Sequence, residues 1–363
     1  MKILFVLPRM VTGGVERVTL RLAAELQSRG HECAFALRRA YGDFLPEAQA
    51  LCPVHEVATA GVHAFVPNLA KLIRKWQPTH VVTAFSDIGF LTDLAIRLSG
   101  HPTFWAHGVH STHSPVAAKP GWAGKQRYWL DQKFSAWVYQ RCHAVVAVSQ
   151  GVRDDVLQKF KCPAHKVFAV YNPVLRSEDL MCQTSKSTPS QASPRIVALG
   201  RLTRQKGFDI LIDAMAQIPQ PWHLEIWGDG EDRQALQQAI HRHGLHQHIR
   251  LCGHTHQPLR VLRNADLFVL SSRYEGFGLV LVEALASLCT IVSTDCPHGP
   301  KEILENGKYG FLVENENPKA LADGIQSALK KNISFSPENL LNRANDFSVV
   351  ISTDQWESIL QEA

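Results

Sequence analysis

The sequence predicts an α/β protein made of two doubly wound, Rossmann-like domains that face each other across a cleft. Short apolar runs alternate with segments of helical periodicity along the whole chain, as parallel strands joined by crossover helices require. The chain has 363 residues, too many for one ordinary core and suitable for two domains. A polar, Ser/Thr/Pro-rich stretch at residues 177–194 separates two series of these runs and predicts a surface linker.

The first series predicts an N-terminal domain over residues 1–175. Its opening strand precedes a glycine turn, and Val15, Val18, Leu22 and Leu26 then form a helical stripe that stops at Gly30. The strands expected in this domain cover residues 3–7, 33–37, 81–85, 103–106, 144–148 and 167–170.

The second series predicts a C-terminal domain over residues 176–345. The strands expected here cover residues 196–199, 224–227, 249–252, 267–270 and 290–293. Open sheets of this kind bind ligands outside the carboxyl ends of their strands, so two of them predict a cleft between the domains. The amphipathic segment 346–363, which contains Trp356 and Leu360, is expected to form a helix that packs back on the first domain.

Composition excludes several classes of protein. Apolar residues make up 45% and charged residues 20% of the chain, which favours packed cores over disorder. The eight cysteines show neither zinc-site nor disulfide spacing and are interpreted as reduced cysteines of a cytoplasmic protein. The first apolar run is too short for a signal peptide, and no run reaches the roughly 18 residues that span a bilayer. A net charge of +5 suits phosphates or an anionic membrane surface but does not by itself indicate nucleic-acid binding.

Two segments are suited to phosphate binding. Gly13 and Gly14 lie at a strand-to-helix turn, where backbone N–H groups and the helix dipole favour an anion. Arg201 and Lys206 follow the first strand of the second domain and could neutralise a diphosphate without a metal ion. Each segment also has a plain structural interpretation, as a tight turn and as two solvated cations.

The most informative segment runs from residue 271 to residue 284. Glu275 is expected in a loop, where it can accept hydrogen bonds from sugar hydroxyls, and the N–H groups of Phe277, Gly278 and Leu279 can meet a donor's phosphate or sugar. Glu283 is expected about one turn into the following helix, where it can accept from ribose hydroxyls or be a partnered core carboxylate.

Arg201 and Lys206, followed by two glutamates separated by seven residues, closely resemble the retaining glycosyltransferases of family 4, which have the GT-B fold. The run from Gly13 to Arg17, the Gly228-Asp229-Gly230 turn and the segment 309–313 fit the same family. These landmarks extend from residue 3 to about residue 330, so the resemblance covers most of the chain.

The resemblance implies a role for each matching residue. Glu275 and His107 would be catalytic, although His107 could equally be a satisfied core histidine. The remaining implied contacts are the diphosphate for Gly13, Gly14, Arg201, Lys206, Gly278 and Leu279; the ribose or base for Glu283, Gly228, Gly253 and His254; and the donor sugar for Gly276, Phe277 and Glu16.

The implied mechanism is same-face attack, in which the leaving phosphate deprotonates the acceptor and Glu275 positions the donor; the alternative is double displacement with Glu275 as the nucleophile. No cofactor and no metal ion are expected, because Arg201 and Lys206 neutralise the phosphates. A histidine-rich stretch between His241 and His256 could bind zinc, but no cysteine or carboxylate arrangement completes a site, and a solvated surface is the preferred interpretation.

The expected substrates are a nucleotide-sugar donor and a glycan or lipid-linked acceptor in cell-surface polysaccharide biosynthesis. The segment from Asp295 to Ile303 resembles a variant common among family members that build bacterial surface polysaccharides, and this resemblance implies a UDP-linked hexose or N-acetylhexosamine. A GDP-mannose or ADP-glucose transferase and a GT-B-fold sugar-nucleotide epimerase are the alternatives. Residues 119–141 interleave basic and aromatic side chains, and predict either docking on the cytoplasmic face of an anionic membrane or packing in the domain core.

Overall fold

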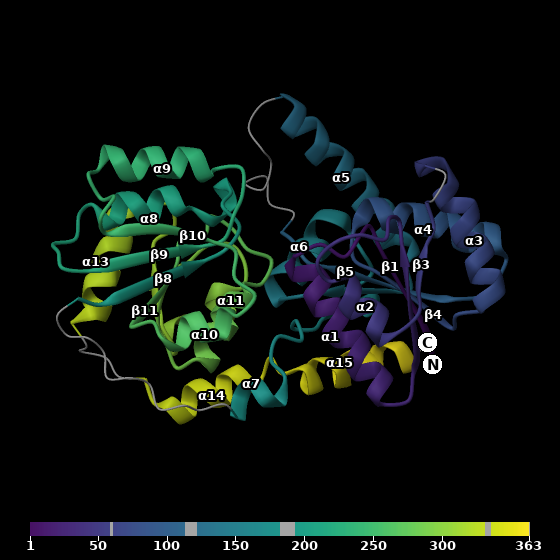
Figure 1. The fold of residues 1–363 in the computed structure, drawn as a ribbon. Coiled ribbons are helices and arrows are strands. Elements are labelled where there is room, and N and C mark those ends of the chain that lie inside the picture. Colours follow the sequence, from purple (N-terminus) through teal and green to yellow (C-terminus); the bar gives the residue numbers. More distant parts are fainter. Residues whose placement is uncertain (59–60, 113–121, 182–192, 331–334, 363) are drawn as a thin grey trace. The chain divides into compact units, whose positions relative to one another are not determined.

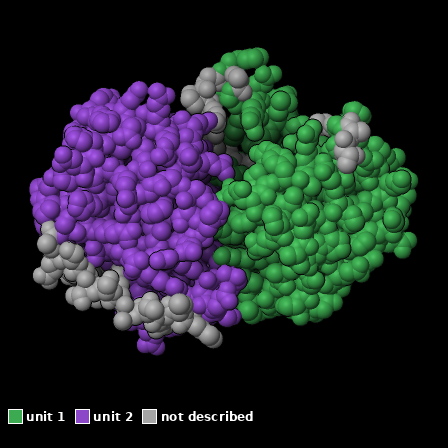
Figure 2. Space-filling view, viewed as in Figure 1, with its two compact units in different colours: residues 1–173, 349–363 green, residues 174–348 purple. Residues whose placement is uncertain are grey.

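The structure is a computed structural model, and it describes residues 1–363 except 59–60, 113–121, 182–192, 331–334 and 363. The chain divides into two compact units (Figure 2): unit 1 comprises Met1–Pro173 and Val349–Ala363, and unit 2 comprises Val174–Ser348. Each unit contains one parallel β-sheet with helices packed on it (Figure 1).

The sheet of unit 1 has seven strands in the order β3-β2-β1-β4-β5-β6-β7. The strands β2 and β3 are added on one side of β1 and the strands β4 to β7 on the other. The switch point at which open α/β sheets bind ligands therefore lies between β1 and β4. The strands are β1 (Lys2–Leu7), β2 (Glu32–Leu37), β3 (Val54–Glu56), β4 (His80–Thr83), β5 (Phe104–Val109), β6 (Ala144–Ala147) and β7 (Val167–Ala169).

The helices of unit 1 lie between successive strands along the chain, as the crossover connections of a doubly wound fold require. They are α1 (Gly14–Ser28), α2 (Leu45–Leu51), α3 (Phe65–Trp76), α4 (Ser86–Ser99), α5 (Trp122–Arg141) and α6 (Gln150–Phe160), with short 3₁₀ turns η1 (Val62–Ala64) and η3 (Ala164–Lys166).

The last helix of the chain, α15 (Val349–Gln361), belongs to unit 1. Trp356 and Leu360 are buried in the same apolar cluster as β1 and α1. Arg29 at the end of α1 donates to Asp354 at 2.6 Å and to Glu357 at 2.9 Å. Helix α15 therefore contributes to the hydrophobic core of unit 1, together with β1 and α1.

The sheet of unit 2 has six strands in the order β10-β9-β8-β11-β12-β13, with its own switch point between β8 and β11. Its strands are β8 (Arg195–Leu199), β9 (His223–Trp227), β10 (Ile249–Gly253), β11 (Leu267–Leu270), β12 (Thr290–Thr294) and β13 (Phe311–Val313). Its helices are α7 (Ser177–Met181), α8 (Phe208–Met215), α9 (Arg233–Arg242), α10 (Pro258–Arg263), α11 (Leu279–Ala286), α12 (Pro300–Ile303), α13 (Pro318–Leu329) and α14 (Pro337–Asn345), with 3₁₀ turns η4 (Arg204–Lys206) and η5 (Glu305–Gly307).

The structure differs from the sequence-based expectations in three places. The predicted linker begins with a helix, α7, while its residues 182–192 lie outside the described part of the chain. The strands β3 and β13 were not predicted, because three residues are too few to show a period-two pattern. Strand β5 continues to Val109 rather than ending at Ala106, since β6 pairs with it as far as that residue.

Candidate active site

Lys206 and Glu275, which the sequence places 69 residues apart, are in direct contact in unit 2. The Lys206 Nζ atom lies 2.6 Å from Glu275 Oε1. Glu275 is 5% exposed, so its carboxylate is nearly buried and requires such a partner. The structure therefore brings an ammonium from the loop after β8 against a carboxylate from the loop after β11.

Glu275 has a second partner that the sequence analysis missed. The hydroxyl of Ser272 donates to the same oxygen, Oε1, at 2.6 Å, and the backbone N–H of Glu275 donates to the Pro297 carbonyl at 2.7 Å. The sequence does contain a signal for this contact, because Ser272 carries a hydroxyl three residues before the loop carboxylate of Glu275. Beside this group, burial first and then the Glu275 carboxylate raise the pKa of the Cys296 thiol, which therefore stays neutral.

The two loops that carry these residues are tied together by backbone contacts. Ser271 Oγ donates to the Lys206 carbonyl at 2.9 Å, and the N–H of Arg273 donates to the Gln205 carbonyl at 2.8 Å. Gly207 has a φ of 61°, and a Cβ at this position would overlap the Ser271 carbonyl oxygen. The loop after β8 thus turns sharply at a glycine and brings the preceding Lys206 to Glu275.

Arg201 lies on the same loop as Lys206 and is exposed. Within the described residues its guanidinium makes no hydrogen bond or ion pair, in contrast to the paired ammonium of Lys206. A free guanidinium at the end of β8 is available to bind a phosphate in bidentate fashion.

The second predicted glutamate lies in α11, directly after the loop of Glu275. Gly278, with a φ of 101°, is the N-cap of α11, and the helix starts at Leu279. The N–H of Leu281 donates to the Gly278 carbonyl at 2.9 Å, whereas the N–H groups of Leu279 and Val280 precede the first bond of the helix and favour an anion. Glu283 is buried at 4% exposure in the second turn, and the ring of Phe277 is buried against Phe347 at a centroid distance of 5.5 Å. Gly276 lies between Glu275 and Phe277 in the same loop.

Three glycines lie at the carboxyl ends of three neighbouring strands in unit 2. Gly200 follows β8, Gly228 follows β9 and Gly253 ends β10. The N–H of Gly228 donates to the Gly253 carbonyl at 2.7 Å, and a Cβ on Gly228 would overlap the Gly200 carbonyl. Because no side chain rises from these positions, a ligand such as a nucleotide base could approach the backbone closely there. His254 follows directly, with its ring 4.7 Å from that of His256.

The candidate residues of unit 1 lie around the start of α1. Gly13 is the N-cap, Gly14 is the first helical residue, and Glu16 is buried at 5% exposure. A Cβ on Gly13 would overlap a carboxylate oxygen of Glu16, so the acidic side chain folds back over this glycine. The lack of a side chain at Gly13 therefore leaves space for the Glu16 carboxylate.

His107 lies inside strand β5, and the expectation that it follows the strand is wrong. Its ring is 1% exposed, Nδ1 is 2.7 Å from Thr83 Oγ1, and it contacts the Tyr139 ring at 5.6 Å. The strand continues past His107 because Val145 of β6 pairs with it. The geometry favours the core interpretation, and a catalytic role for His107 remains a prediction.

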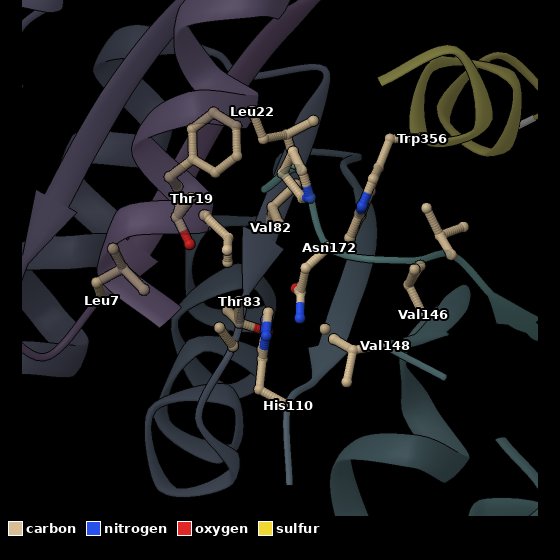
Figure 3. A pocket seen from close by; sticks show the side chains of 16 residues that line it. Leu7, Thr19, Leu22, Val82, Thr83, His110, Val146, Val148, Asn172 and Trp356 are labelled. Atoms are coloured by element: carbon tan, nitrogen blue, oxygen red, sulfur yellow. The ribbon is translucent and has the colours of Figure 1, made fainter. Parts of the chain in front are cut away.

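His110, which directly follows β5, lines a small cavity in unit 1. The cavity has a volume of about 20 Å³, which holds about one water molecule and excludes a sugar. Figure 3 shows His110 and Asn172 pointing toward one another, with Trp356 of α15 nearby. Burial lowers the pKa of His110 to about 4, so its ring is neutral at physiological pH.

Helix α5, which covers most of the predicted basic and aromatic segment, is packed inward over one half and exposed over the other. Residues 119–121 lie outside the described residues. Its C-terminal half packs inward, with Trp137 donating to Asp93 at 2.9 Å and Tyr139 buried. Its N-terminal half is exposed, with Trp122 at 78% and Trp129 at 57%. Among the described residues, no helix has the length and apolarity needed to cross a bilayer.

Histidine rings are frequent between His241 and His256. In the described ranges, no three His, Cys, Asp or Glu side chains are grouped so as to hold a metal ion. The rings of His241 and His246 stack at 5.7 Å, which agrees with a surface of paired histidines.

Two family models match this chain: "Glycosyltransferase Family 4" over residues 12–176 and "Glycosyl transferases group 1" over residues 183–346. An uncharacterized glycosyltransferase of Methanocaldococcus jannaschii is 30% identical over 342 residues, which cover 81% of this chain and 82% of that protein. A Campylobacter jejuni N-acetylgalactosaminyltransferase, named for a diphospho-undecaprenol acceptor, is 27% identical over 193 residues. That match covers 53% of this chain and spans only about half, 52%, of the relative.

Solved structures show the same fold. Anabaena HepE in complex with UDP-glucose has a TM-score of 0.85 at 21% identity, with both chains covered completely. Staphylococcus aureus TarM has a TM-score of 0.77 at 14% identity, with 99% of this chain and 100% of that chain covered. The fold is therefore GT-B, as predicted. The family models and the Methanocaldococcus relative show that the class of protein is a glycosyltransferase.

Together with the extended match to the Methanocaldococcus protein, these findings place the chain more narrowly. It belongs to glycosyltransferase family 4.

Proposed function

We propose that this chain is a retaining glycosyltransferase that transfers a hexose or N-acetylhexosamine from a UDP-sugar to a glycan or lipid-linked acceptor in cell-surface polysaccharide biosynthesis. The observation that carries the proposal is the 2.6 Å contact between Lys206 and Glu275 beside the N-terminus of α11. A cation that could bind a phosphate is thus adjacent to a carboxylate that could accept hydrogen bonds from a sugar, which supports the proposal. A UDP-linked donor is supported by HepE, which binds UDP and UDP-glucose.

In the proposed mechanism, Arg201 and Lys206 bind the donor diphosphate and Glu275 binds the donor sugar. The bond between the anomeric carbon and the phosphate oxygen breaks, and its electron pair stays on the phosphate. The acceptor oxygen forms its bond on the same face, and its proton passes to that phosphate oxygen. The charge that develops on the phosphate is neutralised by the two cations, so the proposal includes no cofactor and no metal ion.

Glu275 acts in this mechanism as a positioning carboxylate. Its Oε1 atom is held by Lys206 and Ser272, and in this proposal the carboxylate binds the donor sugar through hydrogen bonds. The donor ribose would bind Glu283, and the base would lie near Gly228, Gly253 and His254.

The binding test compares nucleotides and nucleotide sugars linked to UDP, GDP and ADP by isothermal titration calorimetry. We expect UDP and a UDP-sugar to bind without added metal. Lys206→Ala should lower kcat/KM by about 100-fold or more, because one of the donors to the departing phosphate is lost. Lys308→Ala, which removes an exposed lysine paired with Glu305, is the matched control.

The outcomes separate the parts of the proposal. Binding of GDP-mannose or ADP-glucose in place of UDP-sugars would overturn the donor assignment. Loss of activity in chelator that magnesium restores would overturn metal independence. NMR of the product determines the anomeric configuration, and an inverted linkage or a covalent glycosyl adduct on Glu275 would contradict same-face attack.

We further propose that the enzyme acts as a peripheral protein on the cytoplasmic face of an anionic membrane. Trp122, Lys125, Trp129 and Lys133 follow one another at spacings of three or four residues and are all exposed, so they share one stripe of α5. Indole rings alternating with lysines are suited to the interface of an anionic bilayer. The Campylobacter relative, whose name specifies a lipid-linked acceptor, supports the same location.

A further inference from the structure

The carboxylate of Glu275 is held through one oxygen only. Ser272 Oγ and Lys206 Nζ both bond to Oε1, each at 2.6 Å. Within the described part of the chain, Oε2 accepts no hydrogen bond. One oxygen is therefore an anchor, and the other is available to a ligand.

The backbone around Ser272 is fixed from the neighbouring strand. Ser272 is fully buried, and Thr294 at the end of β12 donates its hydroxyl to the Ser272 carbonyl at 2.6 Å. The N–H of Glu275 donates to the Pro297 carbonyl, just beyond β12, at 2.7 Å. Both ends of the four-residue segment are thus tied to β12 and the loop that follows it, which gives the Ser272 hydroxyl a defined direction.

The two anchors of Oε1 differ in what a diphosphate would do to them. The Lys206 ammonium has three N–H donors, and an incoming diphosphate would attract it away from the carboxylate. The Ser272 hydroxyl is neutral and buried, so the same anion exerts far less force on it. Ser272 is therefore the anchor that stays in place when a donor binds.

We propose that Ser272 is a positioning residue, which holds Oε1 of Glu275 so that Oε2 is presented to the donor sugar while Lys206 is engaged by the diphosphate. This role rests on the proposed function, because it requires Glu275 to contact the sugar of a nucleotide sugar.

The test measures two ligands that differ only in the sugar. Dissociation constants are determined for each nucleoside diphosphate and for a nucleotide sugar built on it. The pairs are UDP with UDP-glucose, UDP with UDP-N-acetylglucosamine, GDP with GDP-mannose and ADP with ADP-glucose. The variants are then measured with the pair that the unmodified protein binds. Ser272→Ala should leave the affinity for the free nucleoside diphosphate within about twofold. The same substitution should lower the affinity for the nucleotide sugar by about tenfold. The reason is that the lost hydrogen bond, made to a charged group, orients the carboxylate that binds the sugar.

Two further variants separate positioning from general damage. Ser287→Ala removes another buried serine hydroxyl, at the end of α11, and should change neither affinity. In a Glu275→Ala background, Ser272→Ala should have no further effect on the ratio of the two affinities, since its only route to the sugar is removed. Thermal melting of each variant with the diphosphate bound verifies that the unit is folded.

Each result has a defined meaning. The positioning role would be overturned if Ser272→Ala lowered the affinities for the diphosphate and the nucleotide sugar equally. It would also be overturned if Ser272→Ala lowered the affinity for the nucleotide sugar by its full amount in the Glu275→Ala background. If Glu275→Ala alters the ratio but Ser272→Ala does not, the role of Ser272 is wrong while the proposed function stands. If no ligand of the panel binds, or if Glu275→Ala leaves the ratio unchanged, the proposed assignment of Glu275 fails, and the role of Ser272 fails with it.

Discussion

The aliphatic stem of Lys206 lies directly against Gly200. A Cβ at position 200 would lie 3.2 Å from both Cγ and Cδ of Lys206, closer than atoms of this kind normally approach. The backbone N–H of Gly200 donates to the Trp227 carbonyl at 2.9 Å, a bond that alanine can keep. The absence of a side chain at Gly200 therefore provides the space through which Lys206 reaches Glu275.

Gly200→Ala should accordingly shift Lys206 by a few tenths of an ångström while leaving the fold intact. We expect the affinity for a nucleoside diphosphate to fall severalfold and the melting temperature to change little, since only the flexible stem of Lys206 has to move. Calorimetric titration with UDP measures the first effect and thermal denaturation the second. An unchanged affinity would show that the diphosphate does not depend on the position of Lys206.

Gly207→Ala should destabilise unit 2 strongly. Gly207 and Gly244 both have positive φ, at 61° and 69°, so alanine costs about 1 kcal/mol of backbone strain at either position. At Gly207 a Cβ would also overlap the Ser271 carbonyl, whereas at Gly244 no atom lies within 4 Å. Urea unfolding should therefore show that Gly207→Ala lowers the free energy of unfolding by about 1–3 kcal/mol more than the control variant Gly244→Ala does. Equal losses would mean that the turn after η4 relaxes freely.

The unfolding free energy should decrease as the pH falls from about 6.5 to 4. The pKa of His110 is lowered by burial from 6.5 to about 4, so in this interval the unfolded chain binds a proton that the folded chain rejects. The loss is at most about 3 kcal/mol for this one group. Burial also lowers the pKa values of His55, His80 and His143, and these act in the same direction.

Replacing the titrating ring isolates the contribution of His110. Relative to the unmodified protein, His110→Gln should gain stability as the pH is lowered through this interval, whatever its cost at pH 7. Urea unfolding at pH 7, 5.5 and 4 measures the difference, and His256→Gln, at an exposed position, is the control. Parallel pH profiles for His110→Gln and the unmodified protein would contradict the assignment.

Membrane binding should depend on the exposed stripe of α5. Replacing Trp122 and Trp129 together by alanine removes two exposed indoles, and replacing Lys125 and Lys133 by glutamate reverses two charges. Both double variants should reduce co-sedimentation with vesicles containing phosphatidylglycerol by about tenfold or more, because each lysine near an anionic surface contributes about 1 kcal/mol.

The controls for this prediction use the same helix and a second lipid. Vesicles of phosphatidylcholine alone should bind the unmodified protein weakly, and Gln126→Ala, at an exposed position that carries neither charge nor ring, should bind normally. Equal binding to both lipids, or normal binding by the double variants, would overturn the proposed membrane contact. Activity on a water-soluble acceptor should be preserved, which separates docking from catalysis.

The sequence was sufficient for the features that depend on local pattern. Alternating apolar runs predicted most strands of both sheets, because each buried parallel strand is a continuous apolar segment. Glu275 was expected in a loop and Glu283 about a turn into a helix, and both lie there, since glycines and helical periodicity mark that boundary along the chain itself.

The tertiary structure decided which of these residues meet. His107 lies within β5, bonded to Thr83, because pairing with β6 extends the strand beyond its apolar residues. Only one half of α5 is buried, because only that half packs against α4, where Trp137 finds its partners. The periodicity of α5 itself does not show where α4 lies. The contacts of Glu275 with Lys206 and Ser272 depend on strand order and on a turn at Gly207, which distant segments impose on each other and no local pattern records.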